Sequence, residues 1–121
     1  MGIRLAVARS RLSRRILGFL FAHMSFAIPA KRLRETNTLL AFHHPQPSYP
    51  LHILIVPKRS RGGLMDLSPI DNDFLLDLIA AVQSLVREFD LELPGYRLIS
   101  NGGSYQDVAQ LHFHLVSGSQ L

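Results

Sequence analysis

The 121-residue chain contains no cysteine, and none of its apolar runs is long. The lack of cysteine excludes a disulfide scaffold, a cysteine nucleophile and any zinc site built on thiolates. No apolar run reaches the ~20 residues that a membrane-spanning helix needs, and no internal repeat is visible. What remains is a chain with 47% hydrophobic and 18% charged residues. This composition is typical of one globular domain that can bury a core of its own.

Acidic residues are absent from the first 34 positions, which nevertheless carry eight lysines and arginines. From Glu35 onward the chain has nine acids and five bases, so its net charge of +4 reflects the N-terminal segment. We expect residues 1–20 to form a basic helix or extension. Such a helix can make weak contact with a membrane surface or with nucleic acid, or it can be a solvated face packed on the acidic body.

An export signal is another interpretation of this segment. Arg14 and Arg15 precede an apolar stretch, as they would in a twin-arginine signal. His23 and Ser25 interrupt that stretch, however, and residues 28–30 are a poor cleavage site. We therefore expect a cytoplasmic protein.

Apolar periodicity predicts two helices and about five strands. The first helix is expected over residues 5–25. The second starts at Ser68-Pro69, where a serine cap and a proline at the first helical position precede a long apolar stripe. That stripe consists of Phe74, Leu75, Leu78, Ile79, Val82, Leu85, Val86 and Phe89. The strands are expected in two short runs over residues 32–42, around a turn at 35–37, and over residues 51–56, 96–101 and 110–116.

The order of these elements predicts an α+β fold with an antiparallel sheet, across which the long helix lies. Residues 51–56 are apolar at every position except His52, so this strand should be covered on both of its faces. Residues 43–50 contain three prolines and should form a loop before it.

The last predicted strand carries the candidate chemistry. Alternation along a strand places Gln110, His112 and His114 on one face, opposite an apolar face that should join the core. The turn before it, residues 101–106, contains two glycines and Ser104, so its main-chain N–H groups can converge on an anion. An anion cradle beside two imidazoles indicates a phosphate site, in which one histidine attacks or moves protons.

Two other interpretations of the His-x-His pattern stay open on the residues alone. The two histidines could be satisfied side chains at a sheet edge. They could also be a metal pair, which needs at least one further ligand. No acid follows His114, so that ligand would have to come from His43, His44 or His52.

Four blocks of the sequence resemble the histidine triad (HIT) superfamily, and in particular its Hint-like branch. Residues 106–116 resemble the family signature, in which three histidines alternate with apolar residues and two further apolar residues follow. The other three blocks are residues 26–31, 40–58 and 95–104. All four follow the family's order over residues 21–118. The resemblance therefore implies a HIT-like domain over residues 21–121, after the basic segment 1–20.

The resemblance implies a nucleotide-binding hydrolase. His112 matches the nucleophile that forms a nucleotidyl-histidine intermediate, and His114 matches a histidine that contacts the phosphate. The implied reaction releases a nucleoside monophosphate from a leaving group that is often an amine, as in a phosphoramidase.

The resemblance also implies a binding site and partners. The residues that would hold the sugar, phosphate and nucleoside are Asn101, Ser104, Gln106, Asp107, His43 and His44, with His52 in support. The expected partners are a purine nucleotide or a nucleoside phosphoramidate, and a second copy of the chain in a homodimer. The resemblance implies no metal and no cofactor.

The sequence departs from the family pattern at two site positions. Gln110 stands where the first histidine of the triad is expected, and a glutamine amide cannot titrate. If that position only orients the imidazole of His112, a main-chain carbonyl would serve and activity would survive. If it must carry a proton, the chain would be a weak or inactive nucleotide-binding module. His44 replaces an acid that would accept hydrogen bonds from ribose hydroxyls, which puts the nucleoside preference in question.

Overall fold

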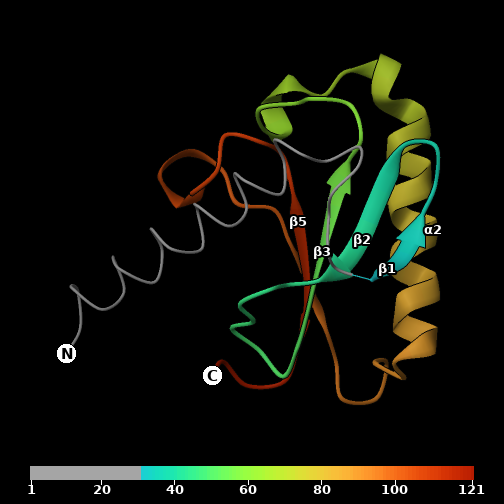
Figure 1. Ribbon diagram of the computed structural model, residues 1–121, viewed down its shortest axis with the longest axis vertical. Helices are drawn as coiled ribbons and strands as arrows, with labels where there is room; N and C mark the ends of the chain where they lie inside the picture. Colours follow the sequence, from blue (N-terminus) through green and yellow to red (C-terminus); the bar gives the residue numbers. More distant parts are fainter. Residues whose placement is uncertain (1–30) are drawn as a thin grey trace.

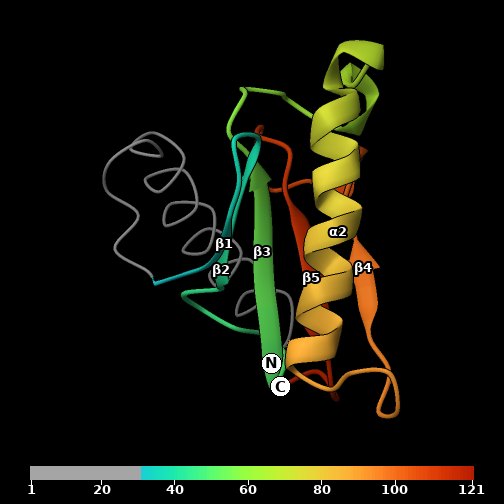
Figure 2. The same cartoon turned by 90° about the vertical axis from the view of Figure 1, so that its right-hand side faces the viewer.

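The computed structural model describes residues 31–121, which form a five-stranded antiparallel sheet with one long helix on it. The strand order is β1-β2-β3-β5-β4 (Figures 1 and 2). The strands are β1 (Arg32–Glu35), β2 (Leu39–His43), β3 (Leu51–Pro57), β4 (Arg97–Ile99) and β5 (Phe113–Ser117). The predicted α+β class, with its sheet and long helix, is confirmed. The predicted basic helix over residues 1–20 and the first helix over residues 5–25 lie outside the described residues.

The long helix α2 (Asn72–Glu88) lies along one face of the sheet, as Figures 1 and 2 show. Its start agrees with the sequence prediction, except that the first turn is the separate 3-10 helix η2 (Pro69–Asp71). The N–H of Ser68 donates to Oδ2 of Asp71 at 3.0 Å, which satisfies one donor at the helix start. Within residues 31–121, no helix is both long and apolar enough to cross a membrane.

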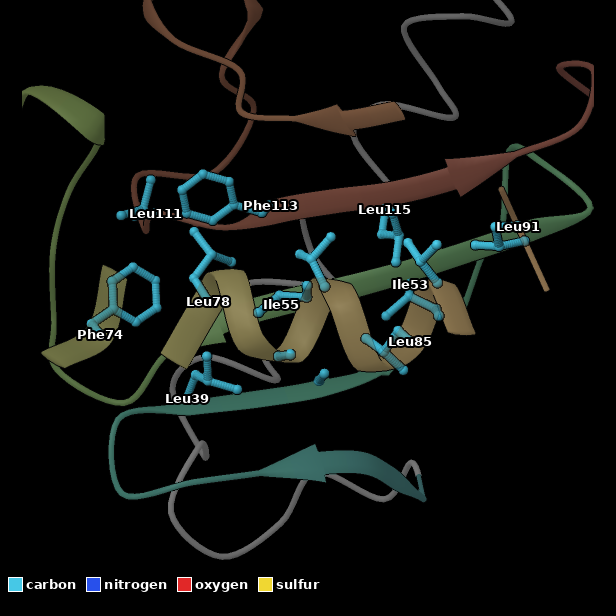
Figure 3. Close-up of a cluster of buried hydrophobic side chains, with 14 residues drawn as sticks. Leu39, Ile53, Ile55, Phe74, Leu78, Leu85, Leu91, Leu111, Phe113 and Leu115 are labelled. Carbon is cyan, nitrogen blue, oxygen red and sulfur yellow. The ribbon is translucent and has the colours of Figure 1, made fainter. Parts of the chain in front are cut away.

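The main core lies between α2 and the sheet (Figure 3). The helix contributes Phe74, Leu78, Ala81, Val82, Leu85 and Val86, and the strands contribute residues such as Leu39, Ile53, Ile55, Phe113 and Leu115. The predicted helical stripe was too wide, because Leu75 and Ile79 are 38% and 52% exposed. On a helix with 3.6 residues per turn, both residues lie beside the stripe that faces the sheet rather than within it.

Strand β3 is buried on both faces, as its unbroken apolar sequence predicts. Ile53, Leu54, Ile55 and Val56 all have 0% exposure. Ile53 and Ile55 face α2 in the core, so alternation turns His52, Leu54 and Val56 to the opposite face. The sheet therefore has a core face and a second face, and the second face carries the candidate site.

The last strand starts later than the sequence pattern predicts. Strand β5 begins at Phe113, which pairs with Ile55 of β3, whereas a strand over residues 110–116 was expected. Before Phe113 the chain leaves the sheet ladder, because the N–H of Leu111 donates to the carbonyl of Arg61 at 2.7 Å. Gln110 thus lies in a bend and His112 directly before β5, so of these three residues only His114 is on the strand.

Candidate functional site

Four imidazole rings meet on the second face of the sheet. They belong to His44, His52, His112 and His114. The ring centroid of His52 lies 4.4 Å from that of His44 and 5.1 Å from that of His114. The ring centroids of His112 and His114 are 4.9 Å apart. His44, His52 and His112 are each only 6% exposed. Imidazoles packed so closely must be neutral or paired to be tolerated in the interior.

The register of the strands brings these histidines together. His52 of β3 pairs with Val116 of β5, and the next pair on the same face is Leu54 with His114, so His52 and His114 are diagonal neighbours. His44 follows directly after β2, and its N–H donates to the carbonyl of His52 at 2.8 Å. His112 directly precedes β5.

Hydrogen bonds fix which nitrogen of His52 and of His114 carries the proton. The main-chain N–H of Ser48 donates to Nδ1 of His52 at 3.0 Å, so the proton of neutral His52 is on Nε2. That nitrogen lies 2.8 Å from Nδ1 of His114 and donates to it. The proton of neutral His114 is therefore on its Nε2. His52 thus sets His114 as a hydrogen-bond donor.

The other two histidines hold their protons on opposite nitrogens. The N–H of Gln46 donates to Nδ1 of His44 at 2.9 Å, so neutral His44 carries its proton on Nε2. Nδ1 of His112 lies 2.8 Å from the carbonyl oxygen of Gln110, which can only accept, so here Nδ1 carries the proton. Of these four imidazoles, only that of His112 has its lone pair on Nε2. The hydrogen bonds therefore give His112 a tautomer opposite to that of the other three histidines.

Burial keeps this cluster neutral. It lowers the pKa of His44 and of His52 to about 4 and that of His114 to about 3, with the neighbouring imidazoles adding to the effect. Burial also lowers the pKa of His112, although the Gln110 carbonyl and the charge of Asp107 oppose this shift. At neutral pH the imidazole of His112 is therefore neutral.

Gln110 acts on His112 through its main chain. Its carbonyl accepts the Nδ1 proton of His112, and any residue at this position can provide that carbonyl. Its side-chain Nε2 is buried and has no hydrogen-bond partner within residues 31–121. The structure therefore supplies an orienting contact that does not depend on a titrating side chain at position 110.

The turn before the histidines contains the 3-10 helix η3 (Gly103–Tyr105), with Asn101 half-buried ahead of it. Gly103 has a φ of +58°, which a glycine adopts without strain. The N–H groups of Tyr105 and Gln106 donate to the carbonyls of Gly102 and Gly103. Because these bonds close the turn itself, main-chain donors to an anion would have to come from its other residues.

The structure gives three further predicted site residues different settings. Nε2 of Gln106 donates to the carbonyls of Gly62 at 2.6 Å and Val108 at 2.9 Å, so this amide ties two loops together. Ser104 is exposed in η3. Asp107 is also exposed, and its charge acts on His112.

His43 does not join the other histidines. It pairs with Ile53 across β2 and β3, and paired residues share a sheet face, so it lies on the face that α2 covers. Its ring meets that of Phe89, at the end of α2, edge-on at 5.8 Å. The His43 side chain therefore lies on the opposite face from the ring of His44, and its contact with the nucleotide stays a prediction.

The structure also reveals a pair that the sequence pattern did not indicate. The guanidinium group of Arg61 bonds both carboxylate oxygens of Asp71. Asp71 was visible only as an acid at a helix start, and Arg61 only as one base in a glycine-containing loop. Within residues 31–121, no three His, Cys, Asp or Glu side chains have an arrangement that could hold a metal ion.

Known proteins share this fold and sequence pattern. The chain matches the HIT domain family over residues 25–121. It is 37% identical over 97 residues to an uncharacterized 13.2 kDa HIT-like protein of Azospirillum brasilense, covering 78% of this chain and 80% of that protein. A HIT family hydrolase from Legionella pneumophila Philadelphia 1 is 34% identical with a TM-score of 0.70, covering 77% of this chain and 85% of that one. A histidine triad nucleotide-binding protein from Candida albicans is 27% identical with a TM-score of 0.72, covering 84% and 75% of the two chains.

Proposed function

The chain belongs to the HIT domain family, and we propose that it is a nucleotide-binding hydrolase of the Hint-like branch. The observation that carries this proposal is the hydrogen bond from Nδ1 of His112 to the carbonyl of Gln110. It leaves the lone pair of a buried, neutral imidazole on Nε2, and this is the nitrogen that would attack the phosphorus of a nucleotide. The names of the similar Legionella and Candida proteins, a hydrolase and a nucleotide-binding protein, agree with this function.

The proposed substrate is a purine nucleoside phosphoramidate or a related nucleotide. Nε2 of His112 attacks the α-phosphorus, a nitrogen–phosphorus bond forms, and the bond to the leaving amine breaks. The amine takes up a proton from solvent water as it leaves. Water then attacks the phosphorus of the nucleotidyl-histidine and gives a proton back to the solvent, which returns neutral His112 and releases the nucleoside monophosphate.

His114 supports this reaction as a donor. Its Nε2 carries a proton because His52 donates to its Nδ1, and burial holds its pKa at about 3. A neutral N–H beside the reacting phosphate can stabilise the developing negative charge without losing its proton to water. We propose Asn101, in the turn before the histidines, as a second side-chain donor to the phosphate.

His44 takes the place beside the nucleoside in this proposal. Its Nε2 carries a proton, so it offers the nucleotide a donor where a carboxylate would offer two acceptors. A ribose diol is therefore held less firmly by this residue, and we expect the enzyme to depend more on phosphate contacts than on the sugar.

The proposed assembly of the protein is a homodimer, and its proposed location is the cytoplasm. Strand β4 is an edge of the sheet and leaves main-chain groups for another strand. Leu98 within it and Tyr96 just before it are 38% and 47% exposed. The other edge, β1, carries charged residues instead. We expect sedimentation to give a dimer for the wild type and a monomer for Leu98→Lys. A monomeric wild type would contradict the dimer.

Turnover of a fluorogenic adenosine phosphoramidate tests the proposed function. The wild type should release the amine, and His112→Ala should bind the nucleotide but release none. Activity that persists in EDTA agrees with the metal-free mechanism, whereas its loss in EDTA points to a metal-dependent site. Saturable nucleotide binding without any release by the wild type would make the chain a binding module on the same fold.

A further inference from the structure

The peptide group between Gln110 and Leu111 is hydrogen-bonded at both of its ends. Its carbonyl accepts the Nδ1 proton of His112 at 2.8 Å, and its N–H donates to the carbonyl of Arg61 at 2.7 Å. A peptide group is planar, so its carbonyl and its N–H can turn only together. The bond to Arg61 therefore fixes the direction of the carbonyl that orients His112, and it also polarises that carbonyl as an acceptor.

The sheet does not hold this peptide group, which lies before the start of β5. The pairing of β5 with β3 extends only to Phe113 with Ile55. On the core side, Leu111 is buried beside Phe113, as Figure 3 shows. The side chain of Leu111 thus anchors the segment, but the rotation of the peptide group depends on its partner, the carbonyl of Arg61.

Arg61 lies in an irregular loop, and its side chain holds it there. Nε of Arg61 is 3.1 Å and 3.2 Å from the two carboxylate oxygens of Asp71, and Nη2 is 3.1 Å from Oδ1. The carboxylate side chain of Asp71 is only 4% exposed, and it also accepts the N–H of Ser68 at the start of the helical segment. A bidentate contact of this kind fixes both distance and angle.

A second contact steadies the same loop. Nε2 of Gln106 donates to the carbonyl of Gly62, the residue after Arg61, at 2.6 Å. The loop has glycines at positions 62 and 63, whose main chain has more freedom than that of other residues. The side-chain contacts of Arg61 and Gln106 therefore replace the regular secondary structure that the loop lacks.

We infer that Arg61, held by Asp71, is a positioning residue for the reaction of His112. The connection runs from the start of the helical segment through the Asp71 carboxylate and the Arg61 main chain to the Gln110–Leu111 peptide and the imidazole. Its role is to keep the proton of His112 on Nδ1 and the lone pair on Nε2. This inference rests on the proposed function for its kinetic effect, but not for its effect on the tautomer.

The test compares Arg61→Ala, Arg61→Lys and Asp71→Asn with the wild type and with Arg59→Ala. Arg59 is exposed in the same loop, so its replacement removes a nearby positive charge while the Arg61–Asp71 contact stays in place. The first measurement is the imidazole ¹⁵N spectrum of His112 in the full chain at neutral pH. The second is kcat and KM for the adenosine phosphoramidate.

We expect Arg61→Ala to shift His112 from the Nδ1–H form toward the Nε2–H form and to lower kcat about 100-fold, with KM within about threefold. Arg61→Lys keeps the charge but not the bidentate geometry and should fall between Arg61→Ala and the wild type. Arg59→Ala should match the wild type in both measurements.

An unchanged His112 tautomer in folded Arg61→Ala would overturn the inference, as would an equal loss of kcat in Arg59→Ala. A rise in KM alone would also overturn it, because it would place Arg61 in binding rather than in positioning. If Arg61→Ala fails to fold, the milder variant Asp71→Asn tests the inference instead, by the His112 tautomer and by kcat and KM. If the wild type turns nothing over, the proposed function fails, and the tautomer still tests the inference about Arg61.

Discussion

The chemistry of each histidine in the four-imidazole cluster depends on one neighbouring donor or acceptor. A main-chain N–H sets the tautomer of His52, which in turn sets that of His114. A main-chain carbonyl sets the opposite tautomer in His112. Four chemically identical rings thus divide into three donors at Nε2 and one ring with its lone pair on Nε2, which is the proposed nucleophile. None of this depends on a titrating side chain at position 110.

Replacement of Gln110 tests that conclusion. Because its carbonyl does the orienting and its buried amide nitrogen has no partner within the described part of the chain, Gln110→Met and Gln110→His should each change kcat/KM by less than about tenfold. Steady-state kinetics beside His112→Ala supply the comparison. A loss as large as that of His112→Ala would give the Gln110 side chain a direct role. A gain of several orders of magnitude in Gln110→His would show that the natural residue impairs the enzyme.

Residue types and spacing predicted part of this site. The alternation of His112 and His114 with apolar residues correctly indicated a histidine face, and the sequence placed His52 on an apolar strand nearby. Tautomers could not be predicted, because they depend on main-chain groups such as the Ser48 N–H that only the folded loop brings into contact. The link from Asp71 through Arg61 to the Gln110–Leu111 peptide spans three separate segments and leaves no local sequence signal.

Secondary-structure elements are joined by side-chain contacts as well as by the core. The hydroxyls of Thr36 and Thr38, in the turn between β1 and β2, both donate to Oδ2 of Asp77 on α2, at 2.9 Å and 2.6 Å. Thr36 Oγ1 also accepts the main-chain N–H groups of Thr38 and Leu39. Asp77 therefore anchors the first hairpin of the sheet to the helix.

Asp77→Ala should lower the free energy of unfolding by about 1 to 2 kcal/mol, because two hydroxyls lose their charged acceptor. Urea denaturation of the full chain measures this change. The matched control is Glu92→Ala, an exposed acid beyond the end of α2, which should change stability by less than about 0.5 kcal/mol. Equal stabilities of the two variants would show that the Asp77 contacts contribute nothing to docking of the helix.

Element boundaries were predictable where local rules govern them. Ser68 and Pro69 begin the helical segment as expected, since a cap and a proline act within one turn. Strand β5 begins three residues later than its alternating sequence suggests, because the N–H of Leu111 is taken by Arg61, a residue fifty positions away. Leu75 and Ile79 were wrongly assigned to the core, since a sequence window does not reveal how wide a stripe the sheet covers.

At the scale of the whole molecule, the histidine cluster links stability to pH. In the unfolded chain a histidine titrates near its ordinary pKa of 6.5, whereas burial lowers the pKa of His44 and His52 to about 4 and that of His114 to about 3. Between these values the unfolded chain binds more protons than the folded one. Stability must therefore fall as the pH drops through this window, and it is fully present above about pH 6.5.

Urea midpoints measured from pH 8 to pH 5 should be constant above about pH 7 and decrease below it. The carboxylates with lowered pKa, Glu35 and Asp71, have ordinary values of 4.5 and 3.8, so their contribution to acid unfolding lies at lower pH. His52→Gln should make the decrease between pH 6.5 and 5 shallower. A midpoint that stays constant down to pH 5 would mean that the cluster is not neutral and buried as described.

We propose that His112 is the covalent nucleophile, and trapping its adduct tests this proposal most directly. The wild type is mixed with adenosine phosphoramidate, quenched early in the reaction, digested and examined by mass spectrometry. We predict an added adenosine monophosphate on the peptide that contains His112, transient in the wild type and absent in His112→Ala. Release of the amine by the wild type with an adduct on another histidine, or undiminished release by His112→Ala, would contradict it.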